Sequence, residues 1–244
     1  MKAWPYPRMI AHRGGGTLAP ENTLAAIRIA PRYGYRGVEF DVMLSADALP
    51  VLIHDETLER TTNGRGNVAD TPAAVLAGLD AGSWKDPRFA GEAVPSFEAA
   101  AKLCIALGLW ANIEIKPARG HAAGTGEVAG RVATRLWRGA SRLPLISSFD
   151  RAALTAAREA APGFPLGWLV DRIEPGWQDE MTALDCVSLN CNQAHLTQAL
   201  VREVKDAGYW LICWTVNDSA DAQRLFDWGI DAMVTDRLDL LAPD

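Results

Sequence analysis

Short runs of apolar residues recur along the chain and alternate with segments whose apolar residues follow a helical period. The runs have the length and the β-branched content of buried strands. The intervening segments begin near helix-capping residues and end near glycine. The predicted strands are residues 9–14, 37–44, 110–116, 144–149, 165–170, 186–191, 210–217 and 231–236. The predicted helices are residues 22–33, 96–107, 127–137, 151–160, 197–207 and 219–228, with caps that include Asn22, Ser96, Asp150, Thr197 and Asp218.

This alternation predicts the fold class. Strands that are buried on both faces read as continuous apolar runs, as in a parallel sheet covered by helices. Eight strand–helix units in 244 residues match an α/β protein with a (β/α)8 TIM barrel, and a doubly wound open sheet is the competing fold. We therefore expect residues 1–244 to form a single domain.

One segment interrupts the alternation after the second predicted strand. Residues 56–95 carry many turn-forming residues, among them Asn63, Gly64, Pro72 and Pro87, between short apolar patches. The segment is too long for a simple strand–helix loop. We expect a small ordered insertion here, which is either a lid over one end of the barrel or a surface decoration.

Composition and charge narrow the functional classes. The chain has 30 acidic and 24 basic residues and a net charge of -6, which leaves no long-range field to hold nucleic acid. The longest charge-free apolar stretches, residues 103–113 and 207–217, are shorter than the roughly 18 residues that span a bilayer, so no stable membrane insertion is expected. The N-terminal sequence has prolines and Arg8 where a secretory signal is apolar, which favours a cytoplasmic protein. The sequence does not indicate an oligomeric state.

Three acidic residues stand inside apolar strands. Glu39 and Asp41 are two positions apart in the predicted strand 37–44, so both side chains project to one face. Pairing with Arg36 would explain the two acids if they stood alone. Glu114 repeats the pattern in strand 110–116. Carboxylates from neighbouring strands form an oxygen cage for a divalent metal ion, Mg²⁺ or Ca²⁺, and we predict that these three residues are the ligands.

Basic residues and histidines occur at the ends of the same strands. His12 in MIAHRG and His54 in PVLIHD each lie at the end of an apolar, strand-like run, and a pair of imidazoles suits proton transfer near neutral pH. Arg13 follows His12 directly, and Lys116 lies two positions after Glu114. In an acidic protein, such local cations favour the binding of a phosphate.

The motifs taken together resemble the glycerophosphodiester phosphodiesterase family, of the bacterial cytoplasmic type. The resemblance covers nearly the whole chain in order, and the joint occurrence of the motifs is far more specific than any one of them. The motifs are HRGGGTLAPENT at 12–23, EFDV at 39–42, VLIHDETLERTTNGRG at 51–66, IEIK at 113–116, WTVN at 214–217 and VTDR at 234–237.

The resemblance implies a barrel with its active site at the carboxyl ends of the strands. It implies Glu39, Asp41 and Glu114 as metal ligands and His12 and His54 as the catalytic pair, with His12 favoured as the base. Arg13 and Lys116 match positions near the phosphate, and Trp214 is expected to line the substrate. Glu21 and Asn22 belong to the second motif with either a functional or a scaffolding role.

The resemblance also implies an activity. This activity is metal-dependent hydrolysis of a small-molecule glycerophosphodiester to glycerol 3-phosphate and an alcohol. One alternative is a lysophospholipase D or sphingomyelinase-like enzyme, which needs an exposed apolar rim; Trp4, Tyr6 and Trp84 are the candidates for it. The other alternative is a non-catalytic binding barrel, which predicts losses among the acids and histidines, and none is lost.

Overall fold

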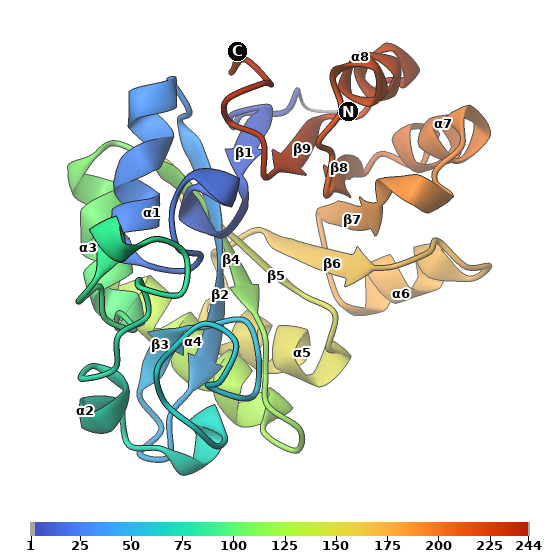
Figure 1. Ribbon diagram of the computed structural model, residues 1–244. Coiled ribbons are helices and arrows are strands. Elements are labelled where there is room, and N and C mark those ends of the chain that lie inside the picture. Colours follow the sequence, from blue (N-terminus) through green and yellow to red (C-terminus); the bar gives the residue numbers. More distant parts are fainter. Residues whose placement is uncertain (1–2, 244) are drawn as a thin grey trace.

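Eight parallel strands form a barrel with helices on its outside (Figure 1). The computed structural model describes residues 3–243. The barrel strands are β1 (Met9–Ala11), β2 (Gly37–Leu44), β4 (Trp110–Ile115), β5 (Leu145–Ser148), β6 (Leu166–Val170), β7 (Ser188–Asn192), β8 (Trp210–Trp214) and β9 (Ala232–Thr235).

The first strand closes the barrel. In β1, Ile10 is in parallel register with Val234 of β9 on one side and with Gly37 of β2 on the other. An open doubly wound sheet would leave two edge strands, and this ring leaves none. The predicted TIM barrel is therefore confirmed, and the competing open sheet is wrong.

A ninth strand was not predicted from the sequence. Strand β3 (Pro50–Leu52) pairs antiparallel with the end of β2, with Met43 opposite Val51. Its three residues begin with proline and lie at the start of the irregular region, so no period of two is visible. The antiparallel turn carries the chain out of the barrel wall just before His54.

Most helices lie where the periodicity predicts them, with a few differences. Thr23, and not Asn22, caps α1, because the Thr23 hydroxyl accepts from the backbone of Ala26, and α1 ends four residues before the predicted end at residue 33. Helix α4 begins five residues before the predicted start at Glu127, and α2 and α6 were not predicted. The bounds are α1 (Leu24–Ile29), α2 (Ala73–Leu76), α3 (Phe97–Ala106), α4 (Ala122–Leu136), α5 (Arg151–Ala160), α6 (Trp177–Ala183), α7 (Gln198–Asp206) and α8 (Ser219–Trp228).

Aromatic side chains close the amino end of the barrel. Trp4 and Tyr6 pack against Trp110 and Trp210, which are the first residues of β4 and β8. Trp4 and Tyr6 therefore lie at the end opposite the carboxyl ends of the strands. They therefore do not supply the apolar rim that the alternative lipid activity needs beside the active site, because their rings pack inside this plug.

The segment between β3 and α3, residues 53–96, has a small hydrophobic core of its own. It contains only short helical turns, and in Figure 1 it runs in cyan and green beside β2 and β3. Leu58, Val68 and Leu76 are buried and pack with Met43 of β2. The segment therefore has a defined shape against the barrel. Among residues 3–243, no helix has the length and apolar character needed to cross a bilayer.

Candidate active site

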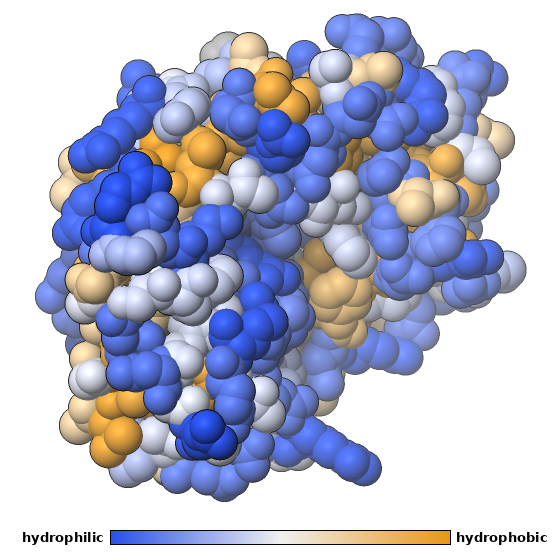
Figure 2. All heavy atoms as spheres, in the orientation of Figure 1, coloured by the Kyte–Doolittle hydropathy of each residue, from blue (hydrophilic) through white to orange (hydrophobic). Residues whose placement is uncertain are grey.

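The eight residues singled out in the sequence line one cavity at the carboxyl ends of the strands. The cavity has a volume of about 280 Å³. Figure 2 shows a face of the molecule that is mostly hydrophilic and is hollowed at its centre. The strands deliver these residues to one place because parallel strands end together at one mouth of the barrel. The lining residues from the sequence analysis are His12, Arg13, Glu39, Asp41, His54, Glu114, Lys116 and Trp214.

The three acidic residues converge as predicted. Carboxylate oxygens of Glu39, Asp41 and Glu114 lie within 4.8 Å of one another. Burial, and then the nearby Asp41 and Glu114 charges, raise the pKa of Glu39 well above its ordinary value. Burial and the Asp41 charge raise the pKa of Glu114 to about 8. The three carboxylates therefore repel one another when all of them are ionised.

The same cluster fits a divalent cation. Glu39 Oε1 is buried and has no hydrogen-bond partner. Oxygen atoms are the ligands that Mg²⁺ and Ca²⁺ prefer, and three carboxylates leave further positions of either ion open for substrate oxygens. An ion between these side chains would satisfy the unpaired oxygen and offset the repulsion, so Glu39, Asp41 and Glu114 are suited to hold one.

Asp41 differs from its two neighbours in having strong local partners. Burial acts to raise its pKa, but Arg13, His54 and Lys116 hold the pKa below the ordinary value. Asn22 donates from Nδ2 to Asp41 Oδ2 at 2.7 Å and accepts from the Asp41 backbone at 3.1 Å. Asn22 is therefore used to fix a carboxylate of the cluster, which explains why it does not cap α1.

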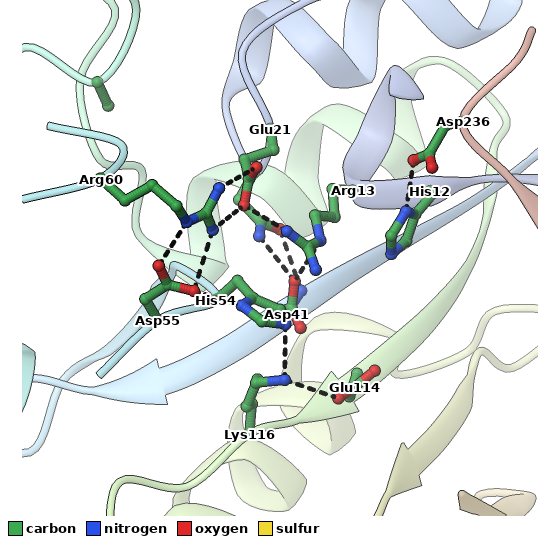
Figure 3. A network of polar contacts seen from close by, with 12 residues as sticks. His12, Arg13, Glu21, Asp41, His54, Asp55, Arg60, Glu114, Lys116 and Asp236 are labelled. Carbon is green, nitrogen blue, oxygen red and sulfur yellow. Dashed lines mark hydrogen bonds and ion pairs between the residues drawn. The ribbon is translucent and has the colours of Figure 1, made fainter. Parts of the chain in front are cut away.

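His12 lies on a tight turn immediately after β1. Its Nδ1 atom is 2.6 Å from Asp236 Oδ1 (Figure 3). Its Nε2 atom is 3.9 Å from Glu39 Oε2. The turn needs left-handed backbone at Arg13, with φ 48°, and at Gly14, with φ 89°. A Cβ on Gly14 would approach the backbone nitrogen of Ile27 at 3.0 Å, so glycine suits this position. The turn directs Nε2 of His12 toward the carboxylates.

His54 has a matching arrangement on the other side of the cluster. Its Nδ1 atom is 2.6 Å from Asp55 Oδ1, and its Nε2 atom is 2.7 Å from Lys116 Nζ. Burial is the main cause that lowers the pKa of His54. In the neutral ring, Nδ1–H donates to Asp55 and Nε2 accepts from the Lys116 ammonium group. Lys116 also lies 3.8 Å from Glu114 Oε1, so it joins His54 to the acidic cluster.

A network of arginines and carboxylates supports both sides (Figure 3). Arg13 Nη1 donates to Glu21 Oε1 at 2.6 Å, and its backbone nitrogen donates to Glu39 at 2.9 Å. Arg60 donates to Glu21 at 2.8 Å through both terminal nitrogens, and to Asp55 at 2.5 and 3.0 Å. Arg60 therefore connects Asp55, which binds His54, with Glu21, which binds Arg13. Glu21 has a structural role within the site.

An aromatic wall faces the charged residues. The rings of Trp214 and Phe149 meet edge to face with centroids 5.5 Å apart, and both residues line the cavity. Trp214 Nε1 is buried and has no hydrogen-bond partner. The wall offers an apolar surface and one free donor to a bound molecule.

Several supporting residues were missed because they lie beside recognised motifs and had no assigned role. Asp55, Arg60 and Asp236 are all within the quoted strings, and Phe149 is the last residue of a predicted strand. Histidine followed by aspartate at a strand end was an available signal for Asp55. Nothing local indicated that Asp236 would meet His12, since the contact spans 224 positions.

Comparison with known proteins agrees with this geometry. Residues 12–240 match the profile of the glycerophosphoryl diester phosphodiesterase family. A glycerophosphodiester phosphodiesterase of Caldanaerobacter subterraneus is 35% identical over 230 residues, which cover 93% of each chain. A glycerophosphodiester phosphodiesterase of Bacillus subtilis is 30% identical over 95% of this chain and 84% of its own.

Solved structures extend the match to three dimensions. An Oleispira antarctica phosphodiesterase, solved with the product sn-glycerol 3-phosphate, aligns with a TM-score of 0.91 and 38% identity over 95% of this chain and 93% of its own. The glycerophosphodiester phosphodiesterase of Agrobacterium tumefaciens aligns with a TM-score of 0.81 and 29% identity over 96% and 98% of the two chains. The chain therefore belongs to the glycerophosphoryl diester phosphodiesterase family.

Proposed function

We propose that this protein hydrolyses glycerophosphodiesters to glycerol 3-phosphate and an alcohol, with a divalent cation, Mg²⁺ or Ca²⁺, held by Glu39, Asp41 and Glu114. One observation carries the proposal. A single cavity holds three converging carboxylates and two imidazoles, each bonded through Nδ1 to an aspartate. This arrangement presents two Nε2 atoms and a cation-binding cluster to one small substrate.

The two histidines supply proton transfer. Asp236 and Asp55 each accept from Nδ1–H, which leaves Nε2 of His12 and of His54 to exchange protons. One imidazole takes the proton of the attacking oxygen, and the other gives a proton to the oxygen of the departing alcohol. Lys116, at 2.7 Å from His54 Nε2, holds a proton next to that atom.

Arg13 and Lys116 bind and orient the phosphate. The cation, when bound, would add to their neutralisation of the phosphate charge and act as a Lewis acid. Glu21 holds the Arg13 guanidinium from one side, so the opposite edge can face the cavity. Trp214 and Phe149 pack against the carbon skeleton of the substrate and exclude water.

The decisive experiment is a panel of glycerophosphodiesters incubated with protein that has been stripped of metal and then supplied with Mg²⁺ or Ca²⁺. Turnover should be absent after stripping and return with the ion. Glu39→Gln, Asp41→Asn and Glu114→Gln should each abolish it, because each removes charge from a small cage. Glu98→Gln, which changes a carboxylate on the surface of α3, is the matched control. Full activity after metal removal would overturn the assignment.

The same panel separates the alternative function. A lysophospholipase D or sphingomyelinase-like enzyme would turn over a lysophospholipid or sphingomyelin faster than a glycerophosphodiester. Trp4 and Tyr6 are packed at the far end of the barrel, so only Trp84 of the three aromatic candidates borders the site region. We therefore favour the glycerophosphodiester. A cytoplasmic location and the insertion at residues 56–95 remain predictions of the sequence.

A further inference from the structure

A second hollow adjoins the catalytic cavity. Its volume is about 390 Å³, and it shares His12 and Arg13 with the cavity. Its other walls include the loop after β1 and two residues of the segment 53–96, Trp84 and Lys85. A molecule bound at Arg13 can therefore extend from the cavity into this hollow.

The turn that carries Trp84 and Lys85 is rigidly held. Asp80 accepts four hydrogen bonds, two from the backbone nitrogens of Gly82 and Ser83, one from the Ser83 hydroxyl and one from Gly91. A Cβ on Gly82 would lie 1.9 Å from the carbonyl oxygen of Phe89, so only glycine fits there. The Trp84 indole donates to the carbonyl of Ala81 at 2.8 Å, while 40% of the residue stays exposed. A large aromatic face is thus fixed in place at the surface.

The charges around the hollow leave one free cation. Glu21 accepts hydrogen bonds from Arg13 and Arg60, and Asp236 is hydrogen-bonded to His12 and Asn217. Lys85 has no carboxylate within ion-pair distance of its ammonium group among residues 3–243. Lys85 is therefore the cation of this hollow that has no carboxylate partner and can meet an anionic group of a ligand.

We propose that this hollow, lined by Trp84 and Lys85, is the subsite for the alcohol half of the diester, and that it selects alcohols bearing an anionic group. The proposal rests on the proposed function. The catalytic cavity, which holds the three carboxylates and both histidines, suits the glycerol phosphate half, and the adjoining hollow is free to accept the alcohol. Trp84 packs against the carbon skeleton of the alcohol, and Lys85 attracts its anionic end.

The test compares two glycerophosphodiesters whose alcohols have similar length and end groups of opposite charge. One has glycolate as its alcohol, which ends in a carboxylate, and the other has ethanolamine, which ends in an ammonium group. The wild-type protein should show the higher kcat/KM for the glycolate diester. Lys85→Glu should invert the preference and change the ratio by at least about tenfold, because attraction becomes repulsion for one substrate and the reverse for the other.

Four further measurements make the result specific. Arg65→Glu makes the same charge change elsewhere on the same segment and should leave the ratio unchanged. Glycerophosphomethanol has no group that reaches Lys85, so Lys85→Glu should change its turnover much less than that of the glycolate diester. Trp84→Ala should raise KM for the glycolate and ethanolamine diesters and spare the methyl diester. Added salt should reduce the effect of Lys85→Glu.

The two proposals fail in different ways. No turnover of any diester by the metal-loaded wild type, the methyl diester included, would overturn the proposed function. Normal turnover of the methyl diester together with an unchanged glycolate-to-ethanolamine ratio in Lys85→Glu would overturn the subsite alone. A wild-type preference for ethanolamine would also overturn the selection of anionic alcohols.

Discussion

His12 and Asp236 are separated by 224 positions in the chain, yet His12 Nδ1 and Asp236 Oδ1 lie 2.6 Å apart. The contact exists because β1 and β9 are neighbours in the closed barrel, with Ala11 opposite Thr235. Asn217 donates to the other oxygen of Asp236 at 3.0 Å. The carboxylate is thus held in one orientation, and it holds the imidazole in turn.

This contact predicts the effect of Asp236→Asn. An amide can turn its NH2 group toward Nδ1 and favour the wrong tautomer of His12, so kcat should fall by about a hundredfold or more. KM should change little, because Asp236 is bonded to the histidine and not placed to grip the phosphate. Asp239→Asn, at an exposed carboxylate that pairs with Arg237, is the control and should keep full activity. Steady-state kinetics of both variants decide the matter.

The metal-free protein should become less stable as the pH rises. Glu114 has an ordinary pKa of 4.5 and a folded pKa of about 8, and the pKa of Glu39 is also raised. Between these two values the unfolded chain loses a proton that the folded chain keeps, so the free energy of unfolding falls with pH. The loss should begin above pH 4.5 and level off above about pH 8.

Thermal unfolding of the chelator-treated protein across this range measures the effect. Added Mg²⁺ or Ca²⁺ should raise Tm more at pH 8 than at pH 5.5, since protons compete with the ion for the carboxylates. Glu114→Gln removes one titrating group and should flatten the profile. A metal-free Tm that stays constant or rises from pH 5 to pH 8 would contradict the prediction.

Arg60 should matter for activity although it does not line the cavity. Its guanidinium binds Asp55 and Glu21, so its loss frees Asp55 from its orientation and leaves Glu21 to pair with Arg13 alone. Arg60→Met should lower kcat/KM on the order of tenfold to a hundredfold, as losses of supporting hydrogen bonds do. Arg60→Lys should recover only part of the lost kcat/KM, since one ammonium group cannot hold both carboxylates.

The matched control is Arg88→Met on the same segment, where Arg88 pairs with Asp86 and is exposed. A double-mutant cycle with Glu21→Gln tests the connection. If Arg60 acts through Glu21, the combined loss should be smaller than the product of the single losses. If Arg60→Met and Arg88→Met have the same kcat/KM, Arg60 does not support the active site.

Arg13→Lys tests the phosphate contact. Lysine keeps one positive charge but loses the planar guanidinium that can bind Glu21 and two phosphate oxygens at once. Turnover should fall by about tenfold or more, and inhibition by inorganic phosphate should weaken. Arg28→Lys, on the partly exposed side of α1, is the control. A parent-like Arg13→Lys protein would make Arg13 a structural residue only.

The identity of the attacking oxygen can be tested with a substrate that lacks the glycerol 2-hydroxyl. We expect this hydroxyl to attack first and to give a cyclic phosphate that water then opens, because intramolecular groups reach effective concentrations of roughly 10⁵ M or more. The 2-deoxy diester should compete with the normal substrate but turn over very slowly. Comparable turnover of the two diesters would show direct attack by water and eliminate the cyclic intermediate.

Local pattern and tertiary contact contributed differently to the site. The apolar runs around Glu39, Asp41 and Glu114 placed three acids in strands, and the alternation of side chains along a strand required Glu39 and Asp41 to point to one face. His12 and His54 were recognisable because each lies at the end of a short apolar run. These features depend on neighbours within a few positions, where spacing and burial are visible in the sequence.

The partners of those residues were decided only by closure of the barrel. Asp236 reaches His12 because β9 pairs with β1, and Arg60 reaches Glu21 because the segment 53–96 folds on its own small core. Neither contact can be predicted from the neighbouring sequence, since two distant segments become neighbours only when the whole ring of strands is complete. The sequence by itself determined which groups stand at the mouth of the barrel, and tertiary structure decided which of them touch, because register across the closed ring sets those distances.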